Sequence, residues 1–234
     1  TRNNKKKTPS GKVLGKKRKR IDSNDVNNML GTLRNKLSPE LYKQVEKELT
    51  SRVVKQTQAL QEQASAFAYQ ATHDQLTDLP NRRAFDGWLA DNFSDFKACN
   101  KSFAIAIMDI DHFKRINDGW SHLIGDQVIC EVANILKAHC EGEQEVARWG
   151  GEEFLVFLPN TRVHYAKQIA ENLRVHLFTH DINKFIRVTV SIGVAGTSPG
   201  EEDINVLIKQ SDQALYLAKA KGRNKVVIWE EDSE

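Results

Sequence analysis

The chain has 234 residues, of which 40% are hydrophobic and 28% charged, and this balance is ordinary for a globular protein. It contains no run of about 18 apolar residues, so nothing in it is expected to span a membrane, and no signal peptide is visible at the basic N-terminus. The three cysteines have no metal-ligand spacing, so we expect reduced thiols and a cytoplasmic location.

The net charge of +3 conceals an uneven distribution, because the first 20 residues hold ten Lys or Arg and no acidic residue. The other 214 residues carry 24 basic and 31 acidic side chains, a net charge of −7, which disfavours a nucleic-acid-binding surface on the fold. We expect residues 1–21 to form a disordered basic arm, either a linker or a segment that contacts anionic lipid. Since the chain begins with Thr1, we also expect a sensor region upstream.

Residues 22–72 are predicted to be helical. Polar capping candidates at 22–25 precede a short helix, and Ser38-Pro39-Glu40 begins a second one with serine as the cap and proline in the first helical position. The second helix continues to about Thr72, and small or apolar residues recur along it in alternating steps of four and three: Val53, Thr57, Leu60, Ala64, Phe67 and Ala71. This narrow seam predicts a parallel coiled-coil dimer; a helix that lies against the following domain is the alternative.

Residues 73–234 are predicted to form a domain of alternating helices and strands. The turn-rich segment 73–83 ends the long helix, because Pro80 does not allow it to continue. Apolar periodicity predicts helices from Phe85 to Phe93, from Phe113 to Ile116, and at 125–138, 162–179 and 203–221. Strands are predicted at 102–110, 146–149, 154–158, 187–195 and 226–229, with a polar loop at 117–122.

This order places one hairpin in the middle of alternating helices and strands. It predicts an α/β (α+β) fold of the ferredoxin-like or palm type, with a mostly antiparallel sheet flanked by helices. A long coiled-coil-type helix precedes this domain.

Two glycines lead directly into two carboxylates at Gly150-Gly151-Glu152-Glu153, just before the strand 154–158. Glycine can adopt positive φ and lets a ligand approach the backbone, and carboxylates beside such a turn suit a hard cation. Asp109 ends the strand 102–110, so its carboxylate joins the pair if the two strands are neighbours. Ligation by oxygen alone favours Mg²⁺ or Mn²⁺ over Zn²⁺. A plain hairpin with two solvated acids is the alternative.

Five segments in this order resemble the GGDEF family of diguanylate cyclases, and together they cover about residues 73–230. They are His73-Asp74 to Arg83, Asp109-Ile110-Asp111-His112-Phe113-Lys114-Arg115-Ile116-Asn117-Asp118, His122-Leu123-Ile124-Gly125-Asp126, Gly150-Gly151-Glu152-Glu153-Phe154 and Ala214 to Asn224. Asp78 and Asp111 are acidic too, and we expect them to be turn or capping residues.

The resemblance implies condensation of two GTP molecules into cyclic di-GMP with release of two pyrophosphates. Each subunit of a homodimer would hold one GTP, with residues 73–234 as the catalytic domain and 22–72 as the signalling segment. The resemblance implies two Mg²⁺ ions, or Mn²⁺, held by Asp109, the Ile110 carbonyl, Glu152 and Glu153. Glu152 would also accept the proton of the 3′-hydroxyl, and Lys114 would stabilise charge on the phosphates.

The resemblance also implies a set of substrate-binding residues: Asn117, His122, Asp126, Gly150, Gly151, Lys219 and Arg223. Asn117 and Asp126 would bind guanine, because a carboxylate accepts the N1–H and N2–H donors that adenine does not offer in that pattern, and His122 would lie nearby. Lys219 and Arg223, four apart on one helix face, would bind the triphosphate. The two glycines would let the backbone approach the phosphates.

One segment departs from the family pattern. Many members carry an Arg-x-x-Asp motif for product inhibition shortly before the two glycines, and the corresponding residues here are Glu141-Gly142-Glu143-Gln144. Both charged residues of the motif are missing, so we expect no allosteric product site at this surface.

Three other functions remain as alternatives to an active cyclase. The first is a catalytically silent domain that binds GTP or cyclic di-GMP, although Asp109, Asn117, Asp126 and the two glutamates are intact. The second is a coiled-coil scaffold, which leaves the carboxylates unexplained. The third is a purine cyclase or palm-type polymerase, which the order of the motifs does not support.

Overall fold

The computed structural model describes residues 23–98, 102–140, 142, 144–182, 186–197 and 203–230. The chain divides into two compact units, Thr1–Gln63 and Ala64–Glu234. The predicted basic arm at 1–21 lies outside the described residues. So do Glu141 and Glu143, which belong to the segment 141–144 in place of the product-inhibition motif. Among the helices described, none combines the length and the hydropathy that a membrane crossing requires.

Two helices make up the N-terminal part of the chain, α1 (Ser23–Lys36) and α2 (Pro39–Thr72), as predicted. Ser38 caps α2, since its side-chain oxygen accepts from the Leu41 amide at 3.4 Å. No residue of α2 is buried, and Leu60 and Phe67 of the predicted seam are 65% and 70% exposed. No residue in the described part of the chain therefore covers the seam. A helix that packs against a second helix only in a coiled-coil dimer would have the same exposed seam in a single chain.

The rest of the chain forms a mixed α/β domain. Its helices are α3 (Arg82–Ala98), α4 (Phe113–Gly119), α5 (His122–His139), α6 (Val163–Thr179) and α7 (Ile204–Ala220). Its strands are β1 (Phe103–Ile110), β2 (Glu145–Arg148), β3 (Glu153–Pro159), β4 (Val190–Gly196) and β5 (Val226–Ile228).

The five strands form one sheet in the order β2-β3-β1-β4-β5. All neighbouring strands are antiparallel except β4 and β5, so the predicted mostly antiparallel sheet is confirmed. β1 lies in the centre, and all eight of its residues are buried, which explains why it reads as a continuous apolar run. Its register with β3 pairs Asp109 with Glu153.

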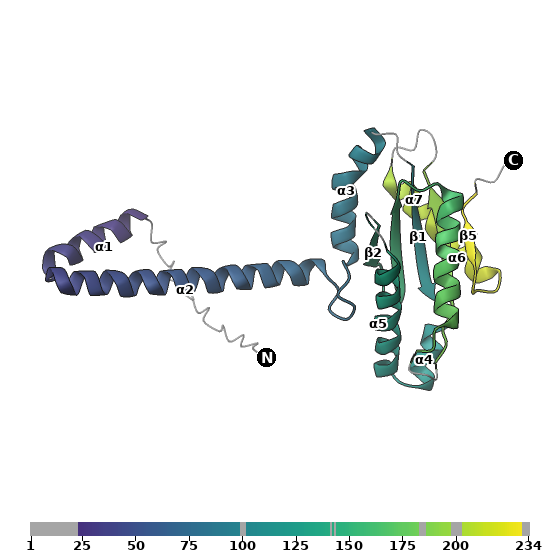
Figure 1. The fold of residues 1–234 in the computed structure, drawn as a ribbon, viewed down its shortest axis with the longest axis horizontal. Helices are drawn as coiled ribbons and strands as arrows, with labels where there is room; N and C mark the ends of the chain where they lie inside the picture. Colours follow the sequence, from purple (N-terminus) through teal and green to yellow (C-terminus); the bar gives the residue numbers. More distant parts are fainter. Residues whose placement is uncertain are drawn as a thin grey trace, which may run out of the picture. The chain divides into compact units, whose positions relative to one another are not determined.

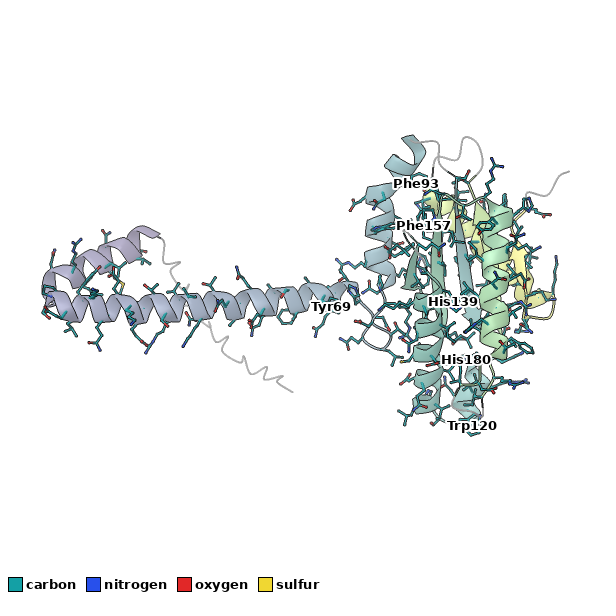
Figure 2. The ribbon with its side chains drawn as sticks, viewed as in Figure 1. Tyr69, Phe93, Trp120, His139, Phe157 and His180 are labelled. Atoms are coloured by element: carbon teal, nitrogen blue, oxygen red, sulfur yellow. The ribbon has the colours of Figure 1, made fainter. Side chains whose placement is uncertain are left out.

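Helices cover both faces of this sheet (Figure 1). Alternate residues of β1 point to opposite faces. Ala104, Ala106 and Met108 pack in a cluster with apolar residues of α5 and α6. Phe103, Ile105 and Ile107 pack in a second cluster with residues of α3 and α7, where Phe157 also lies (labelled in Figure 2). The two clusters hold the sheet rigidly, so residues at the ends of its strands have fixed positions.

Two predicted boundaries were wrong. The segment 117–122 is not a loop, because α4 continues to Gly119 and α5 begins at His122, after Ser121 as its N-cap. The strand predicted at 187–195 begins only at Val190; residues 187–189 lie before β4, and the Thr189 carbonyl accepts from the Asp111 amide. Polar residues in helical turns and extended residues outside a ladder are hard to separate by composition alone.

Candidate active site

The expected carboxylates lie at one end of the central strands. Asp109 of β1 is opposite Glu153 of β3, and the Ile110 amide donates to the Glu152 carbonyl at 3.2 Å. The amides of Trp149 and Gly150 both donate to the Glu153 carbonyl, which closes the turn between β2 and β3. The antiparallel register thus places the strand-end aspartate and the two glutamates at the same end of neighbouring strands.

The two glycines of this turn have different surroundings. A Cβ on Gly150 would meet Glu153 Oε2 at 2.4 Å, so this position has room only for hydrogen while the glutamate folds over it. A Cβ on Gly151 would meet nothing within 4 Å, and this residue is open to an approaching ligand. Neither glycine has a positive φ, so close approach, rather than a left-handed backbone, accounts for them.

A lysine neutralises part of this negative charge. Lys219 Nζ of α7 lies 2.8 Å from Asp109 Oδ2, and the Asp109 side chain is only 9% exposed. Burial nevertheless raises the pKa of Asp109, and Lys219 only partly offsets it. The pKa values of Glu152 and Glu153 are also raised, first by burial and then by the charge of Asp109. The site is therefore short of positive charge.

These donors fit a hard cation, since they are all oxygens and their raised pKa values mean that a positive ion among them would stabilise their charged forms. The expected convergence on one point is nevertheless absent: within the described residues, no three His, Cys, Asp or Glu side chains are already arranged around an ion. The Asp109 carboxylate instead forms an ion pair with Lys219.

Asp111 has a role that its sequence position does not reveal. It is 5% exposed, and its carboxylate accepts from Thr189 Oγ1 and Ser191 Oγ at 2.7 Å each and from the Asn224 amide at 2.9 Å. These bonds join the end of β1 to the start of β4 and to the turn after α7. Asp111 is therefore a buried brace rather than a turn or capping residue.

The two cationic residues expected to bind phosphate come from different local structures. Lys219 lies in the last turn of α7, but the helix ends at Ala220, and Gly222 and Arg223 have φ of 101° and 62°. The Arg223 amide donates to the Ala218 carbonyl at 3.1 Å, in the manner of a left-handed helix stop. The expectation that both residues share one helix face was therefore wrong, because the glycine stop intervenes. The Arg223 charge still lowers the pKa of Asp109, so it lies near the site.

The guanine-binding candidates lie where α4 meets α5. A Cβ on Gly125 would meet Asn117 Oδ1 at 2.0 Å, so the absence of a side chain at Gly125 seats the amide of Asn117. Asn117 Oδ1 is buried and has no hydrogen-bond partner among the described residues, which costs about 1–3 kcal/mol unless a ligand supplies one. Asp126 lines a neighbouring cavity of about 480 Å³ together with Leu76 and Cys130. Lys114 and His122 are exposed, and each lies within five residues of Asn117 in the sequence.

Arg148 organises the glycine turn, a role that the sequence analysis does not predict. Its Nε and Nη2 donate to the carbonyls of Gly150 and Gly151 at 3.2 and 2.7 Å. Its Nη1 donates to Asp74 Oδ1 at 2.7 Å. An arginine two residues before the first glycine is the only local signal in the sequence, since the Asp74 partner lies 74 residues away.

Comparison with known proteins places this geometry in a family. Residues 71–225 match the family model described as diguanylate cyclase, GGDEF domain. The diguanylate cyclase DgcM of Escherichia coli (strain K12) is 41% identical over 157 residues, which are 67% of this chain and 38% of DgcM. The response regulator PleD of Caulobacter vibrioides (strain NA1000 / CB15N) is 38% identical over 162 residues, 67% of this chain and 36% of PleD. The chain therefore spans well under half the length of these curated relatives.

Solved structures agree. The coiled coil and GGDEF domain of DgcB from Caulobacter crescentus, in complex with c-di-GMP, has a TM-score of 0.72 and 32% identity, covering 79% of this chain and 98% of that one. The active GGEEF domain of a diguanylate cyclase from Vibrio cholerae has a TM-score of 0.63 and 33% identity, covering 65% and 98%. With a family model matched over more than half of its length, this chain belongs to the GGDEF family of diguanylate cyclases.

Proposed function

We propose that this chain is an active diguanylate cyclase, which joins two GTP molecules into cyclic di-GMP and releases two pyrophosphates. One observation carries the proposal: Asp109 and Glu153 are paired across β1 and β3, Glu152 is beside them, and Lys219 binds the buried Asp109. Four charged groups at one sheet end suit a reaction in which negative charge moves between phosphate oxygens.

Asp109, the Ile110 carbonyl, Glu152 and Glu153 would hold two Mg²⁺ ions, with Mn²⁺ as a substitute. Ions held there would supply positive charge to the triphosphate and to the departing pyrophosphate. Lys219 now occupies the cation position beside Asp109 at 2.8 Å. We infer that Lys219 leaves the aspartate when the site is loaded and binds the triphosphate instead, together with Arg223 and Lys114.

We assign guanine recognition to residues near the C-terminal end of α4 and the start of α5. Asn117 has a buried oxygen that no described residue hydrogen-bonds, and the exposed carboxylate of Asp126 can accept from the N1–H and N2–H groups of guanine. His122 is the first residue of α5 and precedes Asp126 by four residues in the sequence. A substrate that lacks these donors would leave the polar groups unpaired and lose several kcal/mol of binding.

The reaction needs two copies of the chain. In each of two identical steps, the 3′-oxygen of one GTP attacks the α-phosphorus of the other, a new P–O bond forms, and the bond from the α-phosphorus to pyrophosphate breaks. Glu152 accepts the hydroxyl proton. Since one subunit holds one GTP, the chain would act as a homodimer, and the exposed seam of α2 would bring the two copies together.

The remaining proposals concern the whole protein. GTP is the substrate, so we place the reaction in the cytoplasm. We propose that a sensor region outside residues 1–234 controls α2, and that the basic arm is a linker or contacts a membrane surface.

The test is turnover of GTP with excess Mg²⁺, followed by chromatographic separation of the products, on the wild type, Glu152→Gln and Asp109→Asn. We expect cyclic di-GMP from the wild type and a loss of at least 100-fold in both variants, whereas the exposed control Glu230→Gln should match the wild type. A chelator should abolish turnover, and Mg²⁺ should restore it. A confirmed dimer of wild-type protein that binds GTP without forming product would instead support the silent receptor, and product from Glu152→Gln would show that another group is the base.

A further inference from the structure

The turn that follows α7 carries Arg223, one of the cations proposed to bind the triphosphate, and its backbone is strained. Gly222, Arg223 and Asn224 have φ of 101°, 62° and 47°, so three successive residues lie in the left-handed region. Glycine adopts this region freely, whereas it is costly for a residue with a side chain, although less so for asparagine. Such a conformation persists only where surrounding contacts impose it. The left-handed turn, residues 222–224, therefore depends on bonds from other elements.

Two such bonds reach Asn224 from elements that are distant in the sequence. The Asn224 amide donates to Asp111 Oδ2 at 2.9 Å, and Arg174 Nη1 of α6 donates to Asn224 Oδ1 at 2.8 Å. Asp111 directly follows β1, the strand that carries Asp109. One bond thus ties the left-handed turn to the strand of the expected metal ligand, and the other ties it to α6.

Arg174 reaches the left-handed turn from the opposite side of the sheet. α6 packs in the cluster that contains Ala106 and Met108, whereas α7 packs in the cluster that contains Ile105 and Ile107. α6 also packs beside β5, the strand that follows the turn (Figure 1). Arg174 therefore joins a helix on one face of the sheet to the end of a helix on the other face.

The Arg174 side chain is itself held in place. Its Nε donates to Glu171 Oε2 at 2.7 Å, from a residue one turn earlier on α6, and the side chain is 19% exposed. With one nitrogen on a carboxylate and another on the Asn224 amide oxygen, the planar guanidinium has a fixed orientation. These bonds direct it to the left-handed turn, so Arg174 is suited to support a neighbouring residue.

We propose that Arg174 is a positioning residue for nucleotide binding: by holding Asn224, it fixes the left-handed turn and so sets where Arg223 meets the triphosphate of GTP. This inference rests on the proposed function, which assigns phosphate binding to Arg223. Without Arg174, the turn can relax toward ordinary φ values, and this change would move the Arg223 side chain. A contact between guanidinium and phosphate depends on orientation as well as charge, so a small displacement weakens it.

This effect is confined to the phosphate end of the nucleotide. The residues proposed to bind guanine lie on α4 and α5, whereas Arg174 connects α6 with the left-handed turn. Loss of the Arg174 bond should therefore weaken binding of a triphosphate much more than binding of a monophosphate with the same base. A general loss of structure would weaken both.

The test compares binding of the 3′-deoxy forms of GTP and GMP by calorimetry in excess Mg²⁺, since neither nucleotide can supply the attacking 3′-oxygen. Arg174→Met keeps an apolar stem and removes the donors. We expect this variant to bind 3′-deoxy-GTP about tenfold more weakly than the wild type does, and 3′-deoxy-GMP within about twofold. The matched control is Lys167→Ala, which removes an exposed cation from the same helix and should bind both nucleotides as the wild type does.

A double-mutant cycle tests whether the effect passes through Asn224. Asn224→Ala removes the acceptor and should weaken 3′-deoxy-GTP binding to a similar extent. Arg174→Met in that background should then add a loss of less than about twofold. Additive losses would overturn the proposal, because Arg174 would then act by another route.

Melting temperatures without nucleotide show which variants fold. If Arg174→Met does not fold, Arg174→Lys takes its place. A single ammonium group cannot bond both Glu171 and Asn224 as the planar guanidinium does, so we expect 3′-deoxy-GTP binding to weaken about threefold or more. Unchanged 3′-deoxy-GTP binding in the folded Arg174 variant would overturn the proposal, as would equal weakening of both nucleotides.

These outcomes are distinct from those that test the cyclase reaction. Cyclic di-GMP formed by the wild type would still support the cyclase if the Arg174 variant binds both nucleotides normally. A wild type that binds 3′-deoxy-GTP but forms no product from GTP would refute the cyclase, and the expected loss in Arg174→Met would still support the positioning role. Absence of 3′-deoxy-GTP binding by the wild type would overturn both.

Discussion

Arg148 Nη1 lies 2.7 Å from Asp74 Oδ1, and this ion pair connects the turn that follows α2 with the glycine turn of the candidate active site. Both side chains are largely buried, with 14% and 24% exposure. The same guanidinium holds the Gly150 and Gly151 carbonyls, and Asp74 also accepts from the Thr77 amide and hydroxyl. The end of the long helix and the loop that carries Glu152 are thus held by one arginine.

The first prediction concerns this pair. Asp74→Asn should lower the free energy of unfolding by about 1.5–3 kcal/mol at neutral pH, because it removes a charge-assisted hydrogen bond and leaves Arg148 without its partner. Burial opposes ionisation of Asp74, but the bonds from Arg148 and Thr77 outweigh it, and its pKa is below the usual value. A lowered pKa adds stability above the unfolded pKa of about 3.9, and that stability is lost as the pH falls below it.

Urea unfolding at several pH values measures this effect. The difference between the wild type and Asp74→Asn should be largest near pH 7 and should shrink as the pH falls below about 4. Asp86→Asn is the control, because Asp86 meets Arg82 only at 4.0 Å on an exposed surface. A difference that stays constant down to pH 3 would contradict the ion pair as its source.

The second prediction tests how Asn117 is seated. Gly125→Ala should raise the KM for GTP by about tenfold or more, because the new methyl group would occupy the position of Asn117 Oδ1, 2.0 Å away. Gly87→Ala, where the added Cβ meets nothing within 4 Å, should leave KM unchanged. GTP binding by calorimetry and the melting temperature should be measured together. An unchanged KM in a folded Gly125→Ala protein would show that Asn117 does not bind the base.

The third prediction concerns the packing of α7 on the sheet. A Cβ at Gly193 of β4 would meet the Ser211 carbonyl oxygen at 2.1 Å and the Leu215 amide nitrogen at 2.2 Å, and these are backbone atoms that cannot turn away. Gly193→Ala should therefore cost about 3 kcal/mol of stability or more, since α7 must move off the sheet. The change would also displace Lys219 from Asp109. Thermal unfolding compared with Gly87→Ala measures it, and a loss below about 1 kcal/mol would mean that the helix adapts easily.

The sequence predicts much of this structure because its signals are local. The apolar run of β1, the glycine turn before Glu152 and the serine cap of α2 each follow from neighbouring residues, and all three are present. The brace at Asp111 and the role of Arg148 could not be predicted, because their partners lie 74 to 113 residues away. The Lys219 contact with Asp109 could not be predicted for the same reason, and the family resemblance implies only phosphate binding for that lysine.

The fourth prediction concerns the seam of α2. Leu60→Asp and Phe67→Asp should weaken the homodimer and reduce turnover together, because a charge at these positions would have to be buried between two helices. Ala66→Asp adds the same charge on the outer side of the helix and should change neither property. Sedimentation and turnover at several protein concentrations measure both. Dimer mass that is unchanged after both seam substitutions would refute the coiled coil.

The fifth prediction concerns product feedback. Cyclic di-GMP at micromolar concentration should not inhibit turnover through residues 141–144, because Glu141 and Gln144 stand where the family motif has Arg and Asp. A glutamate there repels the phosphates of the dinucleotide, whereas an arginine would bind them in bidentate fashion. The double variant Glu141→Arg with Gln144→Asp should therefore gain inhibition that the wild type lacks. Turnover titrated with cyclic di-GMP compares the two proteins. Strong inhibition of the wild type that disappears in Glu141→Ala would contradict the prediction, since it would show that these residues bind the product as they stand.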